Sequence, residues 1–98
     1  CRNYGSIGGF WFDGNWAHPE ADWKESRLYG IIRKHQPEAV IINNTGISAH
    51  GAVGHPEIDS LTFEQGLPTR PDRRGWPKYL AGEMCQTMNA HWGVGLND

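Results

Sequence analysis

The chain has 98 residues and a formal net charge of −2 at pH 7. This length suits one small domain, and the near-neutral charge argues against nucleic acid or an anionic membrane surface as a partner. No stretch approaches the roughly 20 apolar residues that cross a bilayer.

The first part of the chain predicts a strand and then a helix. Residues 7–12 are a compact apolar run that ends at Asp13, as expected of a strand buried on both faces. A helix is expected from about Asp22 to Lys34, with Asp22 and Glu25 forming a capping box. Its expected buried face consists of Leu28, Ile31, Ile32 and His35, and its expected water-facing residues are Lys24, Arg27, Arg33 and Lys34.

Three further strands are expected after the helix. Residues 39–44 are β-branched and continuous, residues 59–65 alternate polar and apolar side chains, and residues 80–86 form a fourth candidate. The order strand, helix, strand predicts an α/β fold with a parallel sheet. A closed (β/α)8 barrel takes about 250 residues. We therefore expect residues 1–98 to be a fragment of a single TIM-type catalytic barrel domain, supplying its middle-to-late strands.

The clearest chemical signal is the segment Phe10-Trp11-Phe12-Asp13-Gly14. Barrel enzymes place catalytic groups where parallel strands end, and a buried strand holds such a carboxylate rigidly. Gly14 permits a sharp turn, and the nearby Trp11 and Trp16 offer flat apolar faces that suit the C–H faces of a sugar ring. The alternative is that Asp13 only caps the turn.

A second carboxylate, Glu64, ends the third predicted strand. Retaining glycosidases need two carboxyl groups about 5–5.5 Å apart, one as nucleophile and one as general acid/base. The alternative is that Glu64 is an ordinary surface residue. A zinc site that includes His50 and His55 is the weaker hypothesis, because their spacing matches no standard ligand pattern, and no metal is expected.

Taken together, these motifs resemble the α-L-fucosidases of glycoside hydrolase family 29. The resemblance covers nearly the whole chain, in the family's order. The matching segments are Tyr4-Gly5, Gly9-Phe10-Trp11-Phe12-Asp13-Gly14, Ile32-Arg33, Gln36-Pro37, Val40-Ile41-Ile42-Asn43-Asn44, Asp59 with Thr62 and Glu64, Glu83-Met84-Cys85-Gln86-Thr87-Met88, and Trp92-Gly93. The resemblance implies a (β/α)8-like catalytic domain that hydrolyses terminal α-L-fucose with retention of configuration, without a cofactor.

The resemblance also implies catalytic roles. Asp13 matches the family's nucleophile, which is the aspartate of its Trp-x-Asp-Gly strand end. Glu64 is the best match for the general acid/base, with Glu57 as the runner-up and Glu20 as a distant third. The nucleophile would form a covalent fucosyl ester, which water then hydrolyses.

Three further residues are expected to contact the sugar. Trp11 and Trp92 match aromatic positions that line the pocket and shelter the fucose methyl group. Many family members carry Arg after the Asn-Asn pair, whereas this chain has Thr45, which can hydrogen-bond a hydroxyl but lacks the charge and the reach. The implied partners are fucosylated glycans or oligosaccharides, and the remainder of the barrel is needed to complete the pocket.

Other interpretations remain open at this stage. The chain is also consistent with a non-catalytic carbohydrate-binding barrel, with an inert fragment of the enzyme, or with a different retaining glycosidase. An extracellular, periplasmic or lysosomal location follows from the resemblance alone. Linkage specificity, oligomeric state and the pairing of Cys1 with Cys85 are not fixed by the sequence.

Overall fold

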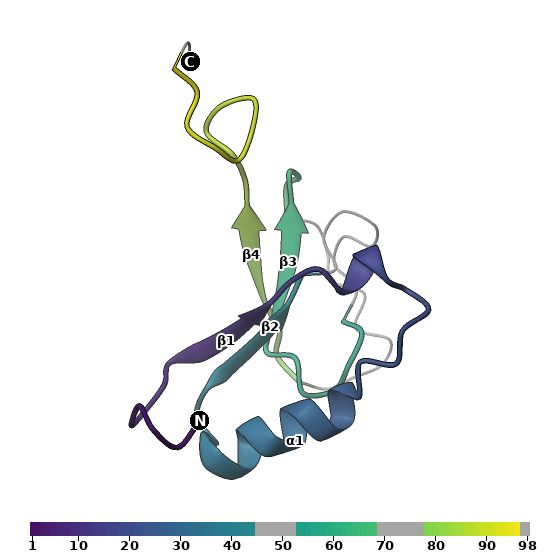
Figure 1. Cartoon of the computed structure of the whole chain (residues 1–98), viewed down its shortest axis with the longest axis vertical. Helices are drawn as coiled ribbons and strands as arrows, with labels where there is room; N and C mark the ends of the chain where they lie inside the picture. The colour runs from purple at the N-terminus through teal and green to yellow at the C-terminus, as the bar shows by residue number, and fades with distance from the viewer. Residues whose placement is uncertain (45–52, 69–77, 97–98) are drawn as a thin grey trace.

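The computed structural model describes residues 1–44, 53–68 and 78–96 (Figure 1). Its elements are the strands β1 (Gly9–Phe12), β2 (Val40–Asn43), β3 (Ser60–Glu64) and β4 (Ala81–Cys85), the short 3-10 helix η1 (Asn15–Ala17) and the helix α1 (Glu25–His35). The strands form one sheet in the order β1-β2-β3-β4, and every neighbouring pair is parallel. The predicted α/β class and its parallel sheet are therefore confirmed, and each strand lies within its predicted range.

The parallel register brings the carboxyl ends of the strands to one edge of the sheet. Gly9 pairs with Val40, and Ser60 pairs with Ala81 two strands further along. Glycine is needed at the first of these positions, because a Cβ on Gly9 would lie 2.9 Å from the carbonyl oxygen of Val40. We call the edge formed by the carboxyl ends the carboxyl edge and the opposite one the amino edge.

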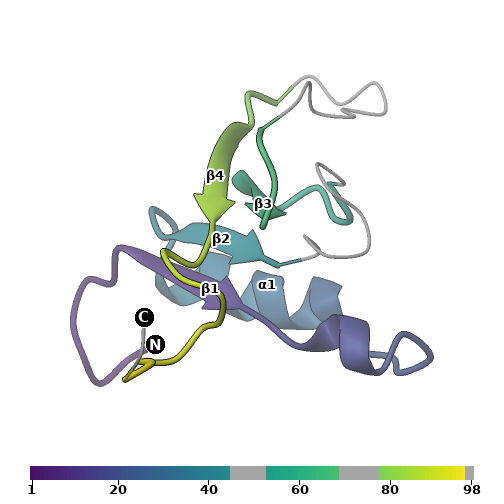
Figure 2. The ribbon, with the colours of Figure 1, turned by 90° about the horizontal axis from the view of Figure 1, so that it is seen from above.

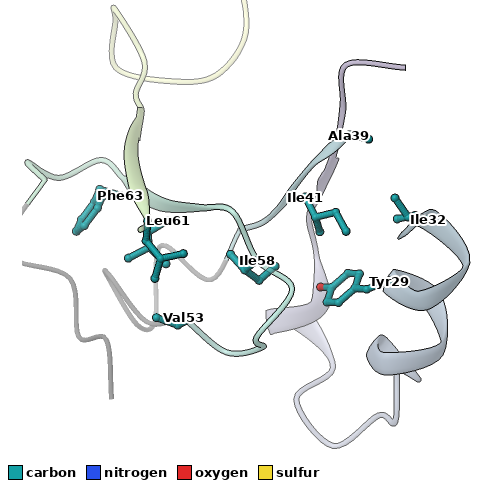
Figure 3. Close-up of a cluster of buried hydrophobic side chains, with 9 residues drawn as sticks. Tyr29, Ile32, Ala39, Ile41, Val53, Ile58, Leu61 and Phe63 are labelled. Atoms are coloured by element: carbon teal, nitrogen blue, oxygen red, sulfur yellow. The ribbon is translucent and has the colours of Figure 1, made fainter. Parts of the chain in front are cut away.

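Helix α1 packs on the face of the sheet formed by β1 and β2 (Figure 2). Tyr29 and Ile32 point from the helix toward Ile41, and the rings of Tyr29 and Phe12 lie 5.8 Å apart (Figure 3). Burying each such side chain contributes about 1.5–3 kcal/mol to folding. The core continues on the same side of the sheet with Val53, Ile58, Leu61, Phe63 and Leu80.

The opposite face of the sheet, which we call the polar face, carries most of the chemistry. Side chains alternate along a strand, and residues that pair in a parallel register share a face. The polar face includes Trp11, Asp13, Ile42, Asn44, Ser60, Thr62, Glu64, Ala81, Glu83 and Cys85. Both cysteines are free thiols, with Cys85 on this face and Cys1 exposed at the chain terminus.

The start of α1 differs from the prediction. The helix begins at Glu25 after Lys24, which has a left-handed φ of 52°, and no side chain caps it. The predicted capping box is wrong because the Oδ1 of Asp22 accepts the backbone N–H of Lys24 at 3.0 Å instead. A short aspartate side chain readily bonds the backbone two residues on, and this local turn competes with a cap.

The buried face of α1 also differs. Tyr29 and Ile32 are buried, whereas Leu28 and Ile31 are 36 % and 45 % exposed. The prediction omitted Tyr29, whose hydroxyl accepts a hydrogen bond from Asn43 Nδ2 at 2.8 Å and so turns this side of the helix toward the sheet.

No helix among the described residues is long and apolar enough to cross a membrane.

Arg33, which was predicted to face water, instead holds the amino edge together. Its guanidinium donates to Glu57 Oε2 at 2.7 Å, to Asp59 Oδ2 at 2.6 Å and to the carbonyl oxygen of Ala39 at 2.7 Å. Lys78 lies 2.6 Å from the other oxygen of Asp59. We call Arg33, Glu57, Asp59 and Lys78 the amino-edge ion cluster. It ties the end of α1 to the starts of β2, β3 and β4.

Candidate active site

Three polar side chains meet at the carboxyl edge. Asp13 follows β1, Asn44 follows β2, and Glu64 ends β3. The backbone N–H of Asn44 donates to the carbonyl oxygen of Phe12 at 2.8 Å, so Asn44 lies beside the residue that precedes Asp13. Gln65 has a φ of 52°, which turns the chain away directly after Glu64. Asp13 is exposed, whereas Asn44 and Glu64 are buried.

The amide of Asn44 joins the two carboxylates. Its Nδ2 lies 3.2 Å from Asp13 Oδ1 and 2.5 Å from Glu64 Oε2. The separation between Asp13 Oδ1 and Glu64 Oε2 cannot exceed the sum of these two distances. It is about 5 Å if each oxygen lies along one of the two N–H bonds of the planar amide. Carboxyl groups of retaining glycosidases lie about 5–5.5 Å apart, and those of inverting enzymes about 6.5–9.5 Å. The upper limit set by the two contacts lies below the inverting range and is compatible with the retaining one.

The carboxylate of Asp13 is held by one of its oxygens. Besides Asn44, Oδ1 accepts the backbone N–H of Gly14 at 2.8 Å and the indole N–H of Trp16 at 3.1 Å. Gly14 has a left-handed φ of 88°, which glycine adopts without strain, and η1 begins directly after it. Within residues 1–44, 53–68 and 78–96, no hydrogen bond reaches Asp13 Oδ2. These contacts therefore fix Oδ1, and none of them engages Oδ2.

A third carboxylate, Glu83 on β4, lies on the polar face. Its Oε1 accepts the indole N–H of Trp11 at 2.5 Å and the hydroxyl of Thr62 at 2.6 Å. Burial raises the pKa of the neighbouring Cys85 thiol, and the negative charges of Glu64, Glu83 and Asp13 raise it further. The three carboxylates therefore lie close enough to act on the same thiol near the carboxyl edge.

The other predicted acid/base residues lie elsewhere. Glu57 belongs to the amino-edge ion cluster, at the opposite end of β3 from Glu64, and its carboxylate accepts from Arg33. Glu20 is exposed and lies 3.4 Å from His18. The structure therefore brings Glu64, and neither of these two, to Asp13.

The predicted sugar-contacting residues are spread more widely. Trp11 lies on β1, two residues before Asp13, with 44 % of its surface exposed. Trp92 follows β4 and lines a shallow hollow of about 410 Å³ made by its own segment, between Gln86 and Gly93. Within the described ranges, no hydrogen bond or ring contact joins Trp92 to Asp13 or Glu64. Thr45 lies outside the described residues.

The histidine-rich loop provides no metal site in the part of the chain that is described, where no three His, Cys, Asp or Glu side chains are placed to hold an ion. His50 lies outside that part. The Nδ1 of His55 accepts the backbone N–H of Glu57 at 3.1 Å, so in the neutral ring Nε2 carries the proton and donates to Ser26 Oγ at 3.0 Å. His55 therefore cannot activate Ser26 as a nucleophile in this arrangement.

No catalytic or binding role was predicted for Asn44 or Glu83. Asn44 had a usable signal, because it ends a predicted strand as Asp13 and Glu64 do, and such residues meet at one edge of a parallel sheet. Glu83 had a weaker one, its place on a strand whose face could not be assigned. A scan against protein-family models and a search of the curated proteins found no match to this chain.

Proposed function

We propose that this chain is part of the (β/α)8-type catalytic domain of a retaining α-L-fucosidase, which hydrolyses terminal α-L-fucose from glycans or oligosaccharides. Asp13 is the nucleophile and Glu64 the general acid/base. The observation that carries the proposal is the Asn44 amide, which donates to both carboxylates and so keeps them close together, as a retaining mechanism needs. The identity of the sugar, fucose, comes from the resemblance of the surrounding motifs to the α-L-fucosidase family.

In the first step, Asp13 Oδ2 attacks the anomeric carbon of the fucoside. The new bond between Oδ2 and this carbon forms as the bond from the carbon to the glycosidic oxygen breaks. Glu64 gives its proton to the departing oxygen, which leaves as an alcohol. Asn44, Gly14 and Trp16 hold Oδ1, so the carboxylate presents its second oxygen in one orientation.

In the second step, Glu64, now ionised, takes a proton from water, and the water oxygen attacks the same carbon. The bond to Asp13 Oδ2 breaks, fucose leaves with its original configuration, and both carboxyl groups return to their starting protonation states. The Asn44 amide donates to both residues throughout, so it keeps their separation constant while the proton moves.

The contact between Trp11 and Glu83 supports the barrel. These residues lie on β1 and β4, which would be about 14 Å apart across a flat sheet with 4.7–4.9 Å between strands. Their side chains nevertheless meet at 2.5 Å. A contact across three strand spacings is favoured when this face is concave, as the inside of a barrel is.

The experiment that tests the function uses the full-length protein that contains this chain. We expect it to release the alcohol from an aryl α-L-fucoside, with α-L-fucose as the first product in NMR spectra. A 2-deoxy-2-fluoro fucosyl fluoride, which slows the second step, should leave a covalent sugar on the peptide that contains Asp13. The matched control is the Asp13→Asn variant, which should remain unlabelled.

Two results would contradict the proposal. Inversion at the anomeric carbon would exclude Asp13 as a nucleophile. No turnover of any aryl glycoside, together with measurable binding of fucose, would favour a non-catalytic carbohydrate-binding barrel that uses the same exposed aromatic rings.

A further inference from the structure

A single oxygen of Glu83 connects three strands of the polar face. Glu83 lies on β4, and its Oε1 accepts from Trp11 on β1 and from Thr62 on β3. Both donors are neutral and the acceptor is a carboxylate, and such charge-assisted hydrogen bonds are about twice as strong as neutral ones. Thr62 is buried, so its hydroxyl is a fixed second donor to this oxygen.

The Trp11 ring depends on this contact for its orientation. Nearly half of its surface is exposed, and none of the aromatic ring contacts in the described part of the chain involves it. An indole has two side-chain torsions, and a hydrogen bond at Nε1 restricts both. Side chains two residues apart on a strand point to the same side, so the ring and the Asp13 carboxylate share the polar face.

We propose that Glu83 is a positioning residue that fixes the Trp11 ring as the apolar wall against which the sugar binds. This inference rests on the proposed fucosidase function. Glu83 transfers no proton in it and acts through Trp11. Without the hydrogen bond the ring turns freely, and the sugar loses a preorganised contact. The Asp13, Asn44 and Glu64 arrangement does not include Glu83, so binding weakens while the chemical steps continue.

The first test is steady-state kinetics of the full-length protein on an aryl α-L-fucoside. Glu83→Leu, which has no acceptor, should raise KM about 10- to 100-fold and change kcat by less than about threefold. Glu83→Gln keeps an amide oxygen as the acceptor and should stay within about threefold of wild type in both constants. Thr62→Val is the matched control: it removes the other donor, leaves the Trp11 bond, and should change KM by less than about threefold.

A double-mutant cycle separates action through Trp11 from a direct effect. In a Trp11→Phe background the indole N–H is absent, so Glu83→Leu should change KM by less than about twofold further. Fully additive effects of the two substitutions would overturn the proposal. A Glu83→Gln variant that loses turnover of poor leaving groups while retaining activated ones would also overturn it, because Glu83 would then act as an acid.

The hydrogen bond between Glu83 and Trp11 can also be measured by NMR, without an activity assay. In protein labelled with ¹⁵N-tryptophan, the indole N–H resonance that disappears in Trp11→Phe should shift in Glu83→Leu, and should shift less in Glu83→Gln. An unchanged resonance in Glu83→Leu would overturn the proposal. A wild-type protein that hydrolyses no fucoside would reject the proposed function, and the resonance would still decide whether Glu83 anchors Trp11.

Discussion

Each edge of the sheet gathers acidic side chains, but their hydrogen-bond donors differ. At the amino edge, the cations Arg33 and Lys78 hold Glu57 and Asp59. At the carboxyl edge, the described donors to Asp13 are a backbone N–H, an indole and an amide, all of them neutral. Carboxylates thus have different environments at the two ends of the same parallel strands.

The difference in donors separates a structural role from a chemical one. A carboxylate paired with a guanidinium is stabilised and fixed, but it is poorly available to a substrate. Neutral donors orient a carboxylate and leave its charge in place, which a nucleophile needs. The described contacts of Asp13 engage one of its oxygens, whereas those of Asp59 engage both. We therefore expect substitutions at the carboxyl edge to affect turnover and those at the amino edge to affect stability.

Replacing the nucleophile should have the largest effect. Asp13→Ala should lower kcat on an aryl α-L-fucoside by about 10⁴-fold or more, because the first step then lacks the carboxylate that attacks the anomeric carbon. Circular dichroism should show unchanged secondary structure, since Asp13 is exposed and lies outside the core. Azide, supplied as an external nucleophile, should restore part of the rate with inverted product. A variant that retains more than a tenth of the wild-type rate would contradict the assignment of Asp13.

Removing the acid/base should have the next largest effect, and its size should depend on the substrate. Glu64→Gln should slow a fucosylated oligosaccharide by about 10²- to 10⁴-fold, while the first step on an aryl fucoside with an acidic leaving group is much less affected. The measurement is the pre-steady-state burst and steady-state rate on both substrates. Glu57→Gln is the matched control and should keep the wild-type pattern. Equal slowing on both substrates in Glu64→Gln would argue against its role as an acid.

Asn44 should come third, because it positions the pair without taking part in bond making. Asn44→Ala removes donors to two carboxylates and should lower kcat/KM by about 10- to 100-fold, while KM changes less than kcat. Asn44→Ser keeps one short donor, so its kcat/KM should lie between those of wild type and Asn44→Ala. A kcat within about twofold of wild type in Asn44→Ala would show that the separation of Asp13 and Glu64 does not depend on this amide.

The sequence was sufficient for the parts of this fold that follow from local pattern. The run of residues 39–44 is continuous and β-branched, and it forms β2 as predicted. Residues 59–65 contain β3, which ends at Glu64, and the parallel register brings this residue to the same edge as Asp13. Strand ends were therefore a reliable guide to which residues could meet.

The sequence was insufficient where a side chain could form alternative hydrogen bonds, with residues nearby or far along the chain. Arg33 occupies a helical position that suits water, yet it bonds Glu57 and Asp59, which follow it by more than 20 residues. The Asx turn at Asp22 displaced the predicted cap because two local hydrogen bonds of similar strength competed for one side chain. The contact between Glu83 and Trp11 joins the two outer strands of the sheet, and a pattern of residues does not reveal such a contact.

At the amino edge, substitution should change stability and leave turnover almost unaffected. Burial alone raises the pKa of Asp59, but hydrogen bonds from Lys78, Arg33 and the backbone of Ile41 outweigh burial, so this pKa lies below its usual range. A carboxyl group with a lowered pKa in the folded state stabilises the protein above its unfolded-state pKa of about 3.9. This stabilisation is lost as the pH falls through the folded-state value. The wild-type protein should therefore lose stability below about pH 4.

Asp59→Asn tests this link directly. The variant should unfold at a lower temperature than wild type at pH 7, and the difference should shrink as the pH falls below about 4, because protonated Asp59 then resembles asparagine. Thermal unfolding of both proteins between pH 7 and pH 2.5 measures the effect, and kcat at pH 7 and a temperature well below unfolding should stay within about twofold of wild type. The control is Glu20→Gln, which replaces an exposed carboxylate outside both edges. It should change neither the dependence of the unfolding temperature on pH nor kcat. A constant difference at every pH would mean that Asp59 contributes shape rather than charge, and a large loss of kcat would mean that the two edges are coupled through β3.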